Sequence, residues 1–482
     1  MTFSNTRYSE AVAQLERGDL KGALSAFNTT SGKVVVSSPA EAQLLSHLCA
    51  KTGNIRQAAR LWGMMAERRT LHNALPPVPG IRKVVLMTPR MQSTDMVTLY
   101  DRLTETGVQL ILLPWMERVS ETPLPENREA LRQRRYQGVP LYDCILYEIC
   151  LEIGLTPNEL DLAIEDHASR IAGAQEAAAR YVDEVLAYID CFAPELILIR
   201  NPYRAENALL RRVATLKELR CLSFEHVINN RIIWDDVSAV SVNSPQAQVY
   251  LQRFDLEVNT AQARTFADDY LAQIKATKRR EHQSGTRAWE QKGKAPVILF
   301  LAQVYTDTSV AFSGSDYATP IDAILALVCY AEKIGAQLLV KIHPHELVEG
   351  TESPTNKRLR DCKEAMDYFT TNGLLDANNT YDTQSLIAAA DVCVTDTSQA
   401  GLEALLTGKE VITLGRAYYS GLGITHDLDV RSQLAPTLDR ILDGTDKRAD
   451  RDTVARFFYL FSEKYCVPDN TDGLAALLEE RV

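Results

Sequence analysis

The distribution of apolar and polar positions divides the chain into a helical part and two parts in which short apolar runs alternate with helical stretches. Through residues 4–75 apolar residues recur at helical spacing, with breaks at Gly18-Asp19 and at Thr52-Gly53-Asn54. This spacing predicts amphipathic helices joined by short turns. The helix–turn–helix form resembles a tetratricopeptide-type repeat pair, and an ordinary helical hairpin fits it equally well. Either form predicts contact with a protein or polymer rather than chemistry.

The proline-rich stretch Ala74–Gly80 predicts a linker, so residues 1–75 are expected to be removable. The second part, residues 81–258, begins with a buried-type apolar run in "RKVVLMTPR", followed by a helical stretch and the run "VQLILLPW". Further strands are predicted at 196–200 and 220–224, and then an irregular polar segment. This rhythm predicts a doubly wound α/β domain.

The third part, residues 290–482, follows a charged, helix-prone bridge and repeats the rhythm more cleanly. Strands are predicted in "PVILFLAQ", "AQLLVKIHP", "DVCVTD" and "KEVITLG", and two helices between them end at Gly335 and Gly408. The predicted fold class is therefore α/β, with two Rossmann-like domains behind an N-terminal helical appendage of residues 1–75. Neither GxGxxG nor GxxxxGK[ST] occurs, so the common dinucleotide and P-loop fingerprints are absent.

Composition and charge narrow the function classes. A chain of 482 residues is too long for one core, and its net charge of -11 disfavours a nucleic-acid binder. The nine cysteines form no CxxC pair, which is typical of reduced thiols in a cytosolic protein. The N-terminus has no signal-peptide pattern, and no apolar run approaches the roughly 20 residues that span a bilayer. We therefore expect a cytoplasmic protein whose membrane contact, at the inner membrane, is at most peripheral.

Hydrogen-bonding residues follow four predicted strands of the third part. The carboxyl ends of parallel strands meet at one edge of the sheet, where ligands bind, so these groups predict a nucleotide site. They are Gln303, Asp307, Thr308 and Ser309; His343, Pro344 and His345; Asp396, Thr397, Ser398 and Gln399; and Gly415, Arg416, Tyr418 and Tyr419. A solvated loop entrance with a proline stop is the alternative interpretation of His343-Pro344.

The helix expected from Ala400 onward predicts how a phosphate is held. Thr397 or Ser398 can cap its first turn, and its free N–H groups suit an anion. Gly401 would let a ligand approach closely. Glu403 could accept hydrogen bonds from ribose hydroxyls, or could simply be a carboxylate that the helix dipole favours.

Three segments carry a family resemblance: "LFLAQVYTDTSV", "VKIHPHE" and "TDTSQAGLEALLTGKEVITLGRAYYSGLGITHD". Together they resemble the bacterial capsular polysaccharide β-Kdo transferases, which have a two-Rossmann-domain GT-B-like fold. That family transfers 3-deoxy-D-manno-octulosonic acid (Kdo) from CMP-Kdo to a glycolipid or growing glycan. The resemblance is good over about 297–427, faint over 83–244, and absent from the first 75 or so residues. The matching positions are Gln303, Asp307, Ser309, His343, Pro344, Ser398, Gly401, Glu403 and Ala404.

The resemblance also implies a retaining reaction, in which a carboxylate of the first α/β domain acts on the sugar from across the cleft. The family more often has an acidic pair followed by glycine where this sequence has Glu225, His226 and Val227. This departure leaves the identity of the reacting residue open. Asp235 and Asp236 in "WDDV" are the alternatives, and each could instead be a turn carboxylate.

We expect no cofactor and no metal. CMP is a leaving group that needs little assistance, and no DxD motif occurs in a suitable context. The expected partners are CMP-Kdo or a similar nucleotide sugar, a glycan or glycolipid acceptor, and a protein bound through the N-terminal helices. Two alternatives stay open: a transferase that uses a different CMP- or UDP-sugar, and a non-catalytic scaffold or export partner with a degenerate transferase fold.

Overall fold

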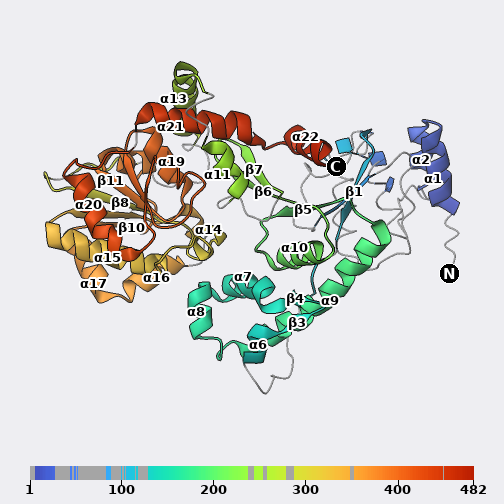
Figure 1. Ribbon diagram of the computed structural model, residues 1–482, viewed down its shortest axis with the longest axis horizontal. Helices are drawn as coiled ribbons and strands as arrows, with labels where there is room; N and C mark the ends of the chain where they lie inside the picture. Colours follow the sequence, from blue (N-terminus) through green and yellow to red (C-terminus); the bar gives the residue numbers. More distant parts are fainter. Residues whose placement is uncertain are drawn as a thin grey trace.

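A computed structural model provides the structure of this protein (Figure 1). It describes residues 6–27, 44, 45, 48, 49, 52, 83–87, 99, 102, 103, 105–113, 115–117, 129–236, 244–252, 258–277, 287–291, 293–347, 352–448 and 450–482. The proline-rich linker predicted at 74–80 and most of the second predicted helical hairpin lie outside these residues. None of the described helices is long and apolar enough to cross a membrane.

The first predicted helical hairpin is present. Helix α1 (Thr6–Glu16) and helix α2 (Leu20–Ser25) are joined at Gly18, whose φ of 75° suits glycine, and the Asp19 side chain caps α2 by accepting from the Gly22 N–H at 2.8 Å. Phe27 is fully buried and belongs to the same apolar cluster as Val85 of the first sheet. The helical part therefore shares its core with the first domain. We expect its removal to uncover apolar surface, contrary to the expectation from the linker.

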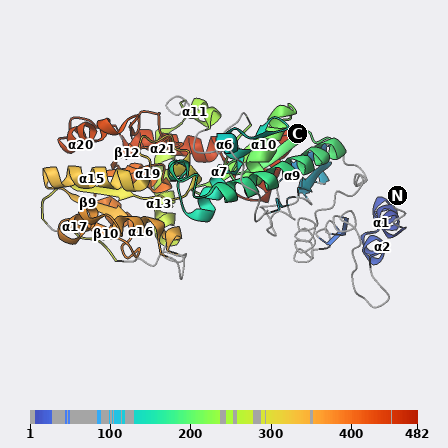
Figure 2. The ribbon, with the colours of Figure 1, turned by 90° about the horizontal axis from the view of Figure 1, so that it is seen from below.

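The first sheet has six described strands in the order β14-β7-β6-β5-β1-β2. Its parallel part comprises β2 (Val108–Leu112), β1 (Lys83–Met87), β5 (Leu196–Arg200) and β6 (Cys221–Val227). Alternate side chains of these strands are buried in two separate apolar clusters, one on each face of the sheet. Figure 2 shows the long helix α9 (Ala168–Phe192) near α7 (Leu141–Ile153) and α10 (Ala205–Leu216), with which it packs.

The other described helices of this part of the chain are α6 (Glu129–Gln133) and α8 (Pro157–Leu162), followed by α11 (Pro245–Leu251) and α13 (Thr260–Thr277), which lead to the second domain. A two-stranded ribbon joins β3 (Arg135–Tyr136) to β4 (Val139–Pro140). Helix α8 begins with a capping box between Thr156 and Glu159, and it faces the second domain.

The segment expected to be irregular after residue 224 is a β-hairpin. Strand β6 continues to Val227, and β7 (Arg231–Asp235) pairs with it in antiparallel register. Asn229 and Asn230 form the turn with φ values of 60° and 50°, which asparagine tolerates better than most residues. The Asn-Asn signal was in the sequence, and the prediction of an irregular segment was wrong.

The second sheet confirms the predicted α/β rhythm most closely. Its order is β10-β9-β8-β11-β12-β13, and every pairing is parallel. In chain order this is 3-2-1-4-5-6, the doubly wound arrangement whose ligand crevice lies between the first and fourth strands. The strands are β8 (Val297–Leu301), β9 (Gln337–Lys341), β10 (Leu374–Asp376), β11 (Val392–Thr395), β12 (Glu410–Thr413) and β13 (His426–Asp427).

Helices cover both faces of this sheet. They are α14 (Thr308–Ala311), α15 (Pro320–Ile334), α16 (Pro354–Arg360), α17 (Lys363–Thr371), α18 (Thr383–Ala389), α19 (Gln399–Leu406), α20 (Leu434–Leu442) and α21 (Arg451–Tyr459). As predicted, Gly335 and Gly408 follow helices α15 and α19, with φ values of 68° and 82°.

The end of the chain returns to the first domain. After α21 a π-helical turn (Leu460–Tyr465) leads to β14 (Val467–Pro468), which pairs antiparallel with β7. The last helix, α22 (Thr471–Arg481), contributes Leu474 and Leu478 to the apolar cluster of the first sheet, and Figure 1 shows it beside β1. The segment assigned from sequence to a second domain at 290–482 therefore has its last strand and helix in the first.

Candidate functional site

A pocket of about 650 Å³ lies between the two domains, at the carboxyl edges of both sheets. The second domain supplies the ends of β8, β9 and β11, and the first domain supplies the ends of β5 and β6. The lining includes these residues predicted from sequence: Glu225, His226, Gln303, Asp307, Ser309, His343, Pro344, Thr397, Ser398 and Glu403. Three of the four strand ends predicted to converge do so at this pocket, and the fourth contributes Tyr418.

The turn after β9 explains why that strand is followed by His343 and Pro344. Pro344 begins a short 3-10 turn (Pro344–Glu346), and His343 caps it through Nδ1, which accepts from the His345 N–H at 3.2 Å. A neutral His343 ring bonded in this way carries its proton on Nε2, the nitrogen that can donate to an anion. Glu346 is buried and accepts from the Tyr305 N–H at 2.6 Å and the Thr355 hydroxyl at 2.9 Å. The turn is thus held rigidly.

The positive charge of Lys341 is not available to a ligand in this pocket. Its side chain is 5% exposed, and Nζ lies 2.6 Å from an oxygen of Asp376, the residue directly opposite in the β9–β10 register. Nζ also donates to the Tyr381 carbonyl at 2.7 Å. A cation buried beside its counter-ion has little field to offer a ligand, so His343 is the better placed anion partner.

Helix α19 points its N-terminus at the pocket. Ser398 caps it by accepting from the Ala400 N–H at 3.3 Å, and the Thr397 hydroxyl donates to the Ser309 carbonyl at 3.3 Å. The free N–H groups of the first turn and the helix dipole favour a phosphate here. Glu403, 4% exposed, accepts from the Gln384 amide at 2.7 Å and also lines the pocket.

Glycine is required at position 401 for a different reason from the one expected from the sequence. A Cβ at this position would collide with the Tyr419 hydroxyl, which donates to the Ser398 carbonyl at 2.5 Å. The space above the first turn is therefore filled by a tyrosine and not left for a ligand. Gly401 allows Tyr419 to hold the capping residue of α19, which fixes the N-terminal end of the helix.

The loop after β8 is organised by its own residues. Asp307 caps α14 by accepting from the Ser309 N–H at 2.7 Å, and the Gln303 amide reaches the Ser309 hydroxyl at 3.4 Å. Asp307 thus shapes the loop, while Gln303 and Ser309 present hydrogen-bonding groups along the pocket.

The first domain contributes the end of β6. Glu225 and His226 both line the pocket. His226 is engaged elsewhere: its Nδ1 lies 2.5 Å from an oxygen of Asp469, just beyond β14, and its Nε2 is buried. We assign His226 to anchoring the returning C-terminal segment on the strand that carries Glu225.

The two alternative carboxylates lie away from the pocket lining. Asp235 is 1% exposed and accepts from the Ser244 hydroxyl at 2.5 Å, at the start of α11. Asp236 accepts from the Gln246 amide and lies 3.8 Å from the Arg481 guanidinium. Asp235 is the last residue of β7 and opposes Ser223, two residues before Glu225 on β6, and Asp236 follows it.

Two sets of contacts fix the domains against each other beside the pocket. The Tyr203 ring of the first domain stacks on Phe312 of the second, with centroids 3.9 Å apart. The Tyr305 hydroxyl donates to Glu159 at 2.9 Å, and Arg358 donates to the Gly154 carbonyl at 2.7 Å. Because Glu346 holds the Tyr305 backbone, the His-Pro turn is coupled to the position of the first domain.

Sequence reasoning missed Asn201. This residue follows β5 with a φ of 52°, lines the pocket, and its amide reaches the Thr308 hydroxyl across the cleft at 3.5 Å. The strand-end rule, applied to the first domain as well as the second, would have found it. Tyr418, named at the fourth strand end but not chosen, lines the pocket with a buried hydroxyl and stacks on Phe461 at 4.6 Å.

Asp396 is the unusual titratable group beside the site. It follows β11, is 2% exposed, and has one carboxyl oxygen without a hydrogen-bond partner among the described residues. Burial raises the pKa of its carboxyl to about 7. No group of three or more His, Cys, Asp or Glu side chains in the described part of the chain is arranged to hold a metal ion.

Comparison of the sequence with known protein families gives one match. Residues 257–454 match the family model described as "Capsule polysaccharide biosynthesis protein". The matched segment is less than half of the chain. The resemblance to capsular polysaccharide proteins found in the sequence motifs is thereby confirmed over the strand ends that form the second-domain side of the pocket.

Two curated relatives match about half of the chain. The capsule polysaccharide modification protein LipA from two Neisseria meningitidis strains, of serogroups B and A, is 24% identical over 257 residues, 52% of this chain. That match is 33% of the relative, so the chain spans about a third of the length of these proteins.

Similar solved structures include Thermosulfurimonas dismutans KpsC, beta Kdo 2,4 transferase, at a TM-score of 0.41 and 18% identity, covering 59% of this chain and 87% of that one. The UDP-GlcNAc 2-epimerase of Neisseria meningitidis has a TM-score of 0.32 and 11% identity, covering 83% of this chain and 99% of the other.

Proposed function

We propose that this protein is a capsule glycosyltransferase that transfers Kdo, or a related sugar acid, from a CMP-activated donor to a surface-glycan acceptor with retention of configuration. The observation that carries the proposal is the pocket in which His343, the N-terminus of α19 and Glu225 face one space from two domains. The family match over 257–454 and the motifs at these strand ends support the same assignment.

The groups divide the work between the domains. The phosphate of CMP would lie between the N-terminus of α19 and His343, and Glu403 would accept from the ribose hydroxyls. Two anionic groups, phosphate and sugar carboxylate, suit a pocket whose donors are backbone N–H groups, an imidazole and side-chain amides. Lys341, neutralised by Asp376, would add little.

The transfer would proceed in two displacements. The Glu225 carboxylate would form a bond to the anomeric carbon as the bond from that carbon to the phosphate oxygen breaks, and CMP would leave with the electron pair. The acceptor hydroxyl would then displace Glu225, form the new glycosidic bond and lose its proton to water. Two inversions at one carbon give net retention.

The first test is nucleotide selectivity, measured as the shift in thermal unfolding with CMP, UMP, CMP-Kdo and UDP-GlcNAc. A ligand present at 100 times its dissociation constant adds about 2.7 kcal/mol to the free energy of unfolding. We expect shifts of that order with CMP and CMP-Kdo and smaller ones with UMP and UDP-GlcNAc. Equal shifts with cytidine and uridine nucleotides would remove the CMP assignment, and no shift with any would remove the nucleotide site.

The second test is His343→Ala. A charge-assisted hydrogen bond contributes roughly 1.5–3 kcal/mol, so CMP affinity measured by calorimetry should fall about 10- to 150-fold. His343→Gln is the matched control, because its amide can still donate to an anion, and it should lose less affinity. Unchanged CMP affinity in His343→Ala would reduce the His-Pro strand end to a turn.

A second candidate function is that of a scaffold or export partner that binds the nucleotide sugar without turnover. The helical hairpin of α1 and α2, a form typical of protein-contact repeats, motivates this alternative. Binding of CMP-Kdo with no release of CMP in the presence of acceptor would support this alternative.

A further inference from the structure

The two domains also meet beside helix α16, and Arg358 stands at the centre of this junction. Its Nη2 donates to the Gly154 carbonyl of the first domain at 2.7 Å, and its Nε lies 3.3 Å from Oε1 of Glu159. The face of the same guanidinium lies over the Tyr305 ring, 4.0 Å from the ring centroid. A planar guanidinium can hydrogen-bond along its edge and stack through its face at the same time. The described residues that line the nucleotide pocket include none of these four.

The first domain presents two acceptors to Arg358. Helix α7 ends at Gly154, which has a φ of 71°, and the carbonyl groups of a last helical turn carry the partial negative charge of the helix dipole. Glu159 divides its oxygens: Oε2 accepts from the Thr156 N–H at 2.7 Å in the capping box of α8, and Oε1 accepts from the Tyr305 hydroxyl at 2.9 Å. The corner between α7 and α8 is therefore a fixed binding place for one cation of the second domain.

The second domain fixes Arg358 from the other side through Glu346. Besides the Tyr305 N–H, this buried carboxylate accepts from the Ser353 hydroxyl and from the Thr355 N–H at 3.1 Å. Ser353 caps α16, the helix that carries Arg358. Glu346 also belongs to the short turn after β9, so the His-Pro side of the pocket, Tyr305 and α16 form one unit.

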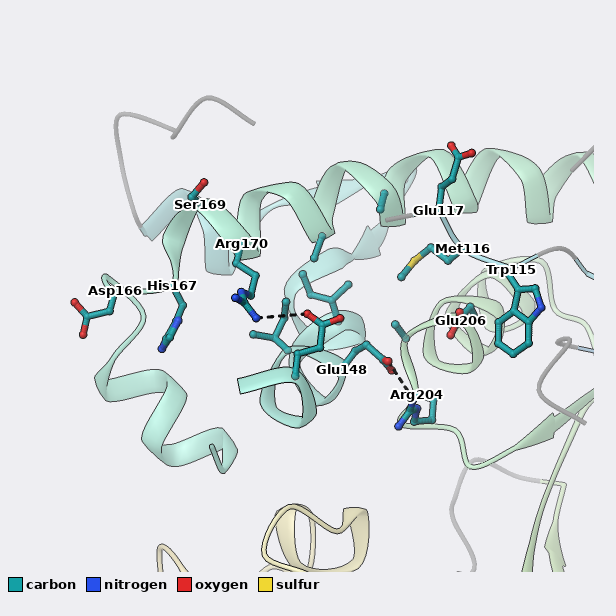
Figure 3. A pocket seen from close by; sticks show the side chains of 16 residues that line it. Trp115, Met116, Glu117, Glu148, Asp166, His167, Ser169, Arg170, Arg204 and Glu206 are labelled. Atoms are coloured by element: carbon teal, nitrogen blue, oxygen red, sulfur yellow. Dashed lines mark hydrogen bonds and ion pairs between the residues drawn. The ribbon is translucent and has the colours of Figure 1, made fainter. Parts of the chain in front are cut away.

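A second ion pair connects the α7–α8 corner to the wall of the nucleotide pocket. Figure 3 shows Glu148 of α7 facing Arg204, at 3.1 Å, in a first-domain cavity of about 760 Å³. Arg204 ends the loop of residues 201–204, in which Asn201 lines the nucleotide pocket. Strands β5 and β6 are neighbours in the sheet, so this loop starts beside the strand end that carries Glu225. The position of α7 therefore bears on the first-domain wall of the pocket.

We propose that Arg358 is a positioning residue for the transfer: it holds the α7–α8 corner against the second domain, so that the loop 201–204 and Glu225 face the donor. The inference rests on the proposed transferase function. The groups proposed to hold the phosphate, His343 and the N-terminus of α19, belong to the second domain, so CMP binding does not need this junction. Transfer does need it, because the reacting carboxylate comes from the first domain, and a misplacement of about 1 Å can cost about 100-fold in rate.

The test is Arg358→Gln in the full-length protein. The turnover number for CMP release from CMP-Kdo, with a pool of capsule oligosaccharides as acceptors, should fall about 10- to 100-fold, while calorimetric CMP affinity stays within about twofold. Arg358→Lys should lose less, because an ammonium group can still donate to the Gly154 carbonyl. Glu159→Gln should also slow transfer, and Arg358→Gln/Glu159→Gln should lose little more than Arg358→Gln, as expected for residues that act through one contact.

Hydrogen exchange gives a readout that needs no reaction. The amides of Tyr203 and Arg204 should exchange about threefold or more faster in Arg358→Gln than in the wild type. The matched control is Arg360→Gln, on the same helix, because the Arg360 side chain is 61% exposed and pairs with Glu352 of its own domain. This control should leave exchange, transfer and CMP affinity unchanged.

Unchanged exchange in Arg358→Gln, equal effects of Arg360→Gln, or a CMP affinity that falls together with turnover would each overturn the inference. Wild-type protein that binds CMP but releases none from CMP-Kdo, with faster exchange confined to Arg358→Gln, would support the coupling across the junction and count against the transferase function alone.

Discussion

Replacing Glu225 with glutamine should reduce sugar transfer by a factor on the order of 10²–10⁴ while CMP affinity stays within about twofold of the wild type. Glu225 lies on the first-domain side of the pocket, and the second domain supplies the groups that we propose bind the phosphate. An interaction that is made only with the reacting sugar lowers turnover without weakening binding of the nucleotide. The measurement pairs calorimetric CMP affinity with the rate of CMP release from CMP-Kdo in the presence of acceptor.

The matched control is Glu218→Gln, which removes an exposed carboxylate of the same domain and should leave both quantities unchanged. Near-normal transfer by Glu225→Gln would assign the chemistry to another group. Asp235 and Asp236 would then have to be reconsidered, although their partners, Ser244 and Gln246, hold them away from the pocket lining.

Asp396→Asn should make the protein more stable at pH 8 than the wild type, and the gain should disappear in acid. Burial raises the pKa of this carboxyl from 3.8 to about 7, so the folded state holds the proton more tightly than the unfolded state. The free energy of unfolding is therefore greatest below the unfolded pKa, falls as pH rises from about 4 to about 7, and stays low above that. The loss amounts to about 4 kcal/mol, at roughly 1.4 kcal/mol for each pKa unit.

Urea unfolding of wild type and variant at pH 4.5 and at pH 8 measures this difference directly, because other groups titrate alike in both proteins. Asparagine keeps the shape and carries no charge, so its curve should lack the fall between these two pH values that Asp396 contributes. Asp429→Asn, at an exposed position, is the control. Parallel pH profiles for Asp396→Asn and the wild type would mean that Asp396 is not desolvated as the structure has it.

The sequence predicted the second domain better than the first for a physical reason. Its strands are all parallel and buried on both faces, so each reads as a continuous apolar run. Parallel strands also share one carboxyl edge, which is why polar residues after three separate runs could be placed together before their contacts were known. Glu225, at the end of β6 in the first domain, was chosen from the family motif and not from its surroundings.

The features that the sequence did not predict depend on contacts between residues that are far apart along the chain. Strand β14 joins β7 more than 230 residues earlier, and the His226–Asp469 contact follows from that pairing. The burial of Lys341 depends on Asp376 standing opposite it in the sheet register. Gly401 was assigned to a ligand because nothing in the local sequence indicates that Tyr419 fills the space above it.

The most direct test of the central claim is the release of CMP from CMP-Kdo, followed with and without a pool of capsule oligosaccharides as acceptors. The account predicts release that depends on both the acceptor pool and Glu225, together with a new glycan product that contains Kdo in the same anomeric configuration as the donor. Tight CMP-Kdo binding with release no faster than in buffer would contradict it and would make the protein a nucleotide-sugar binder instead of a transferase.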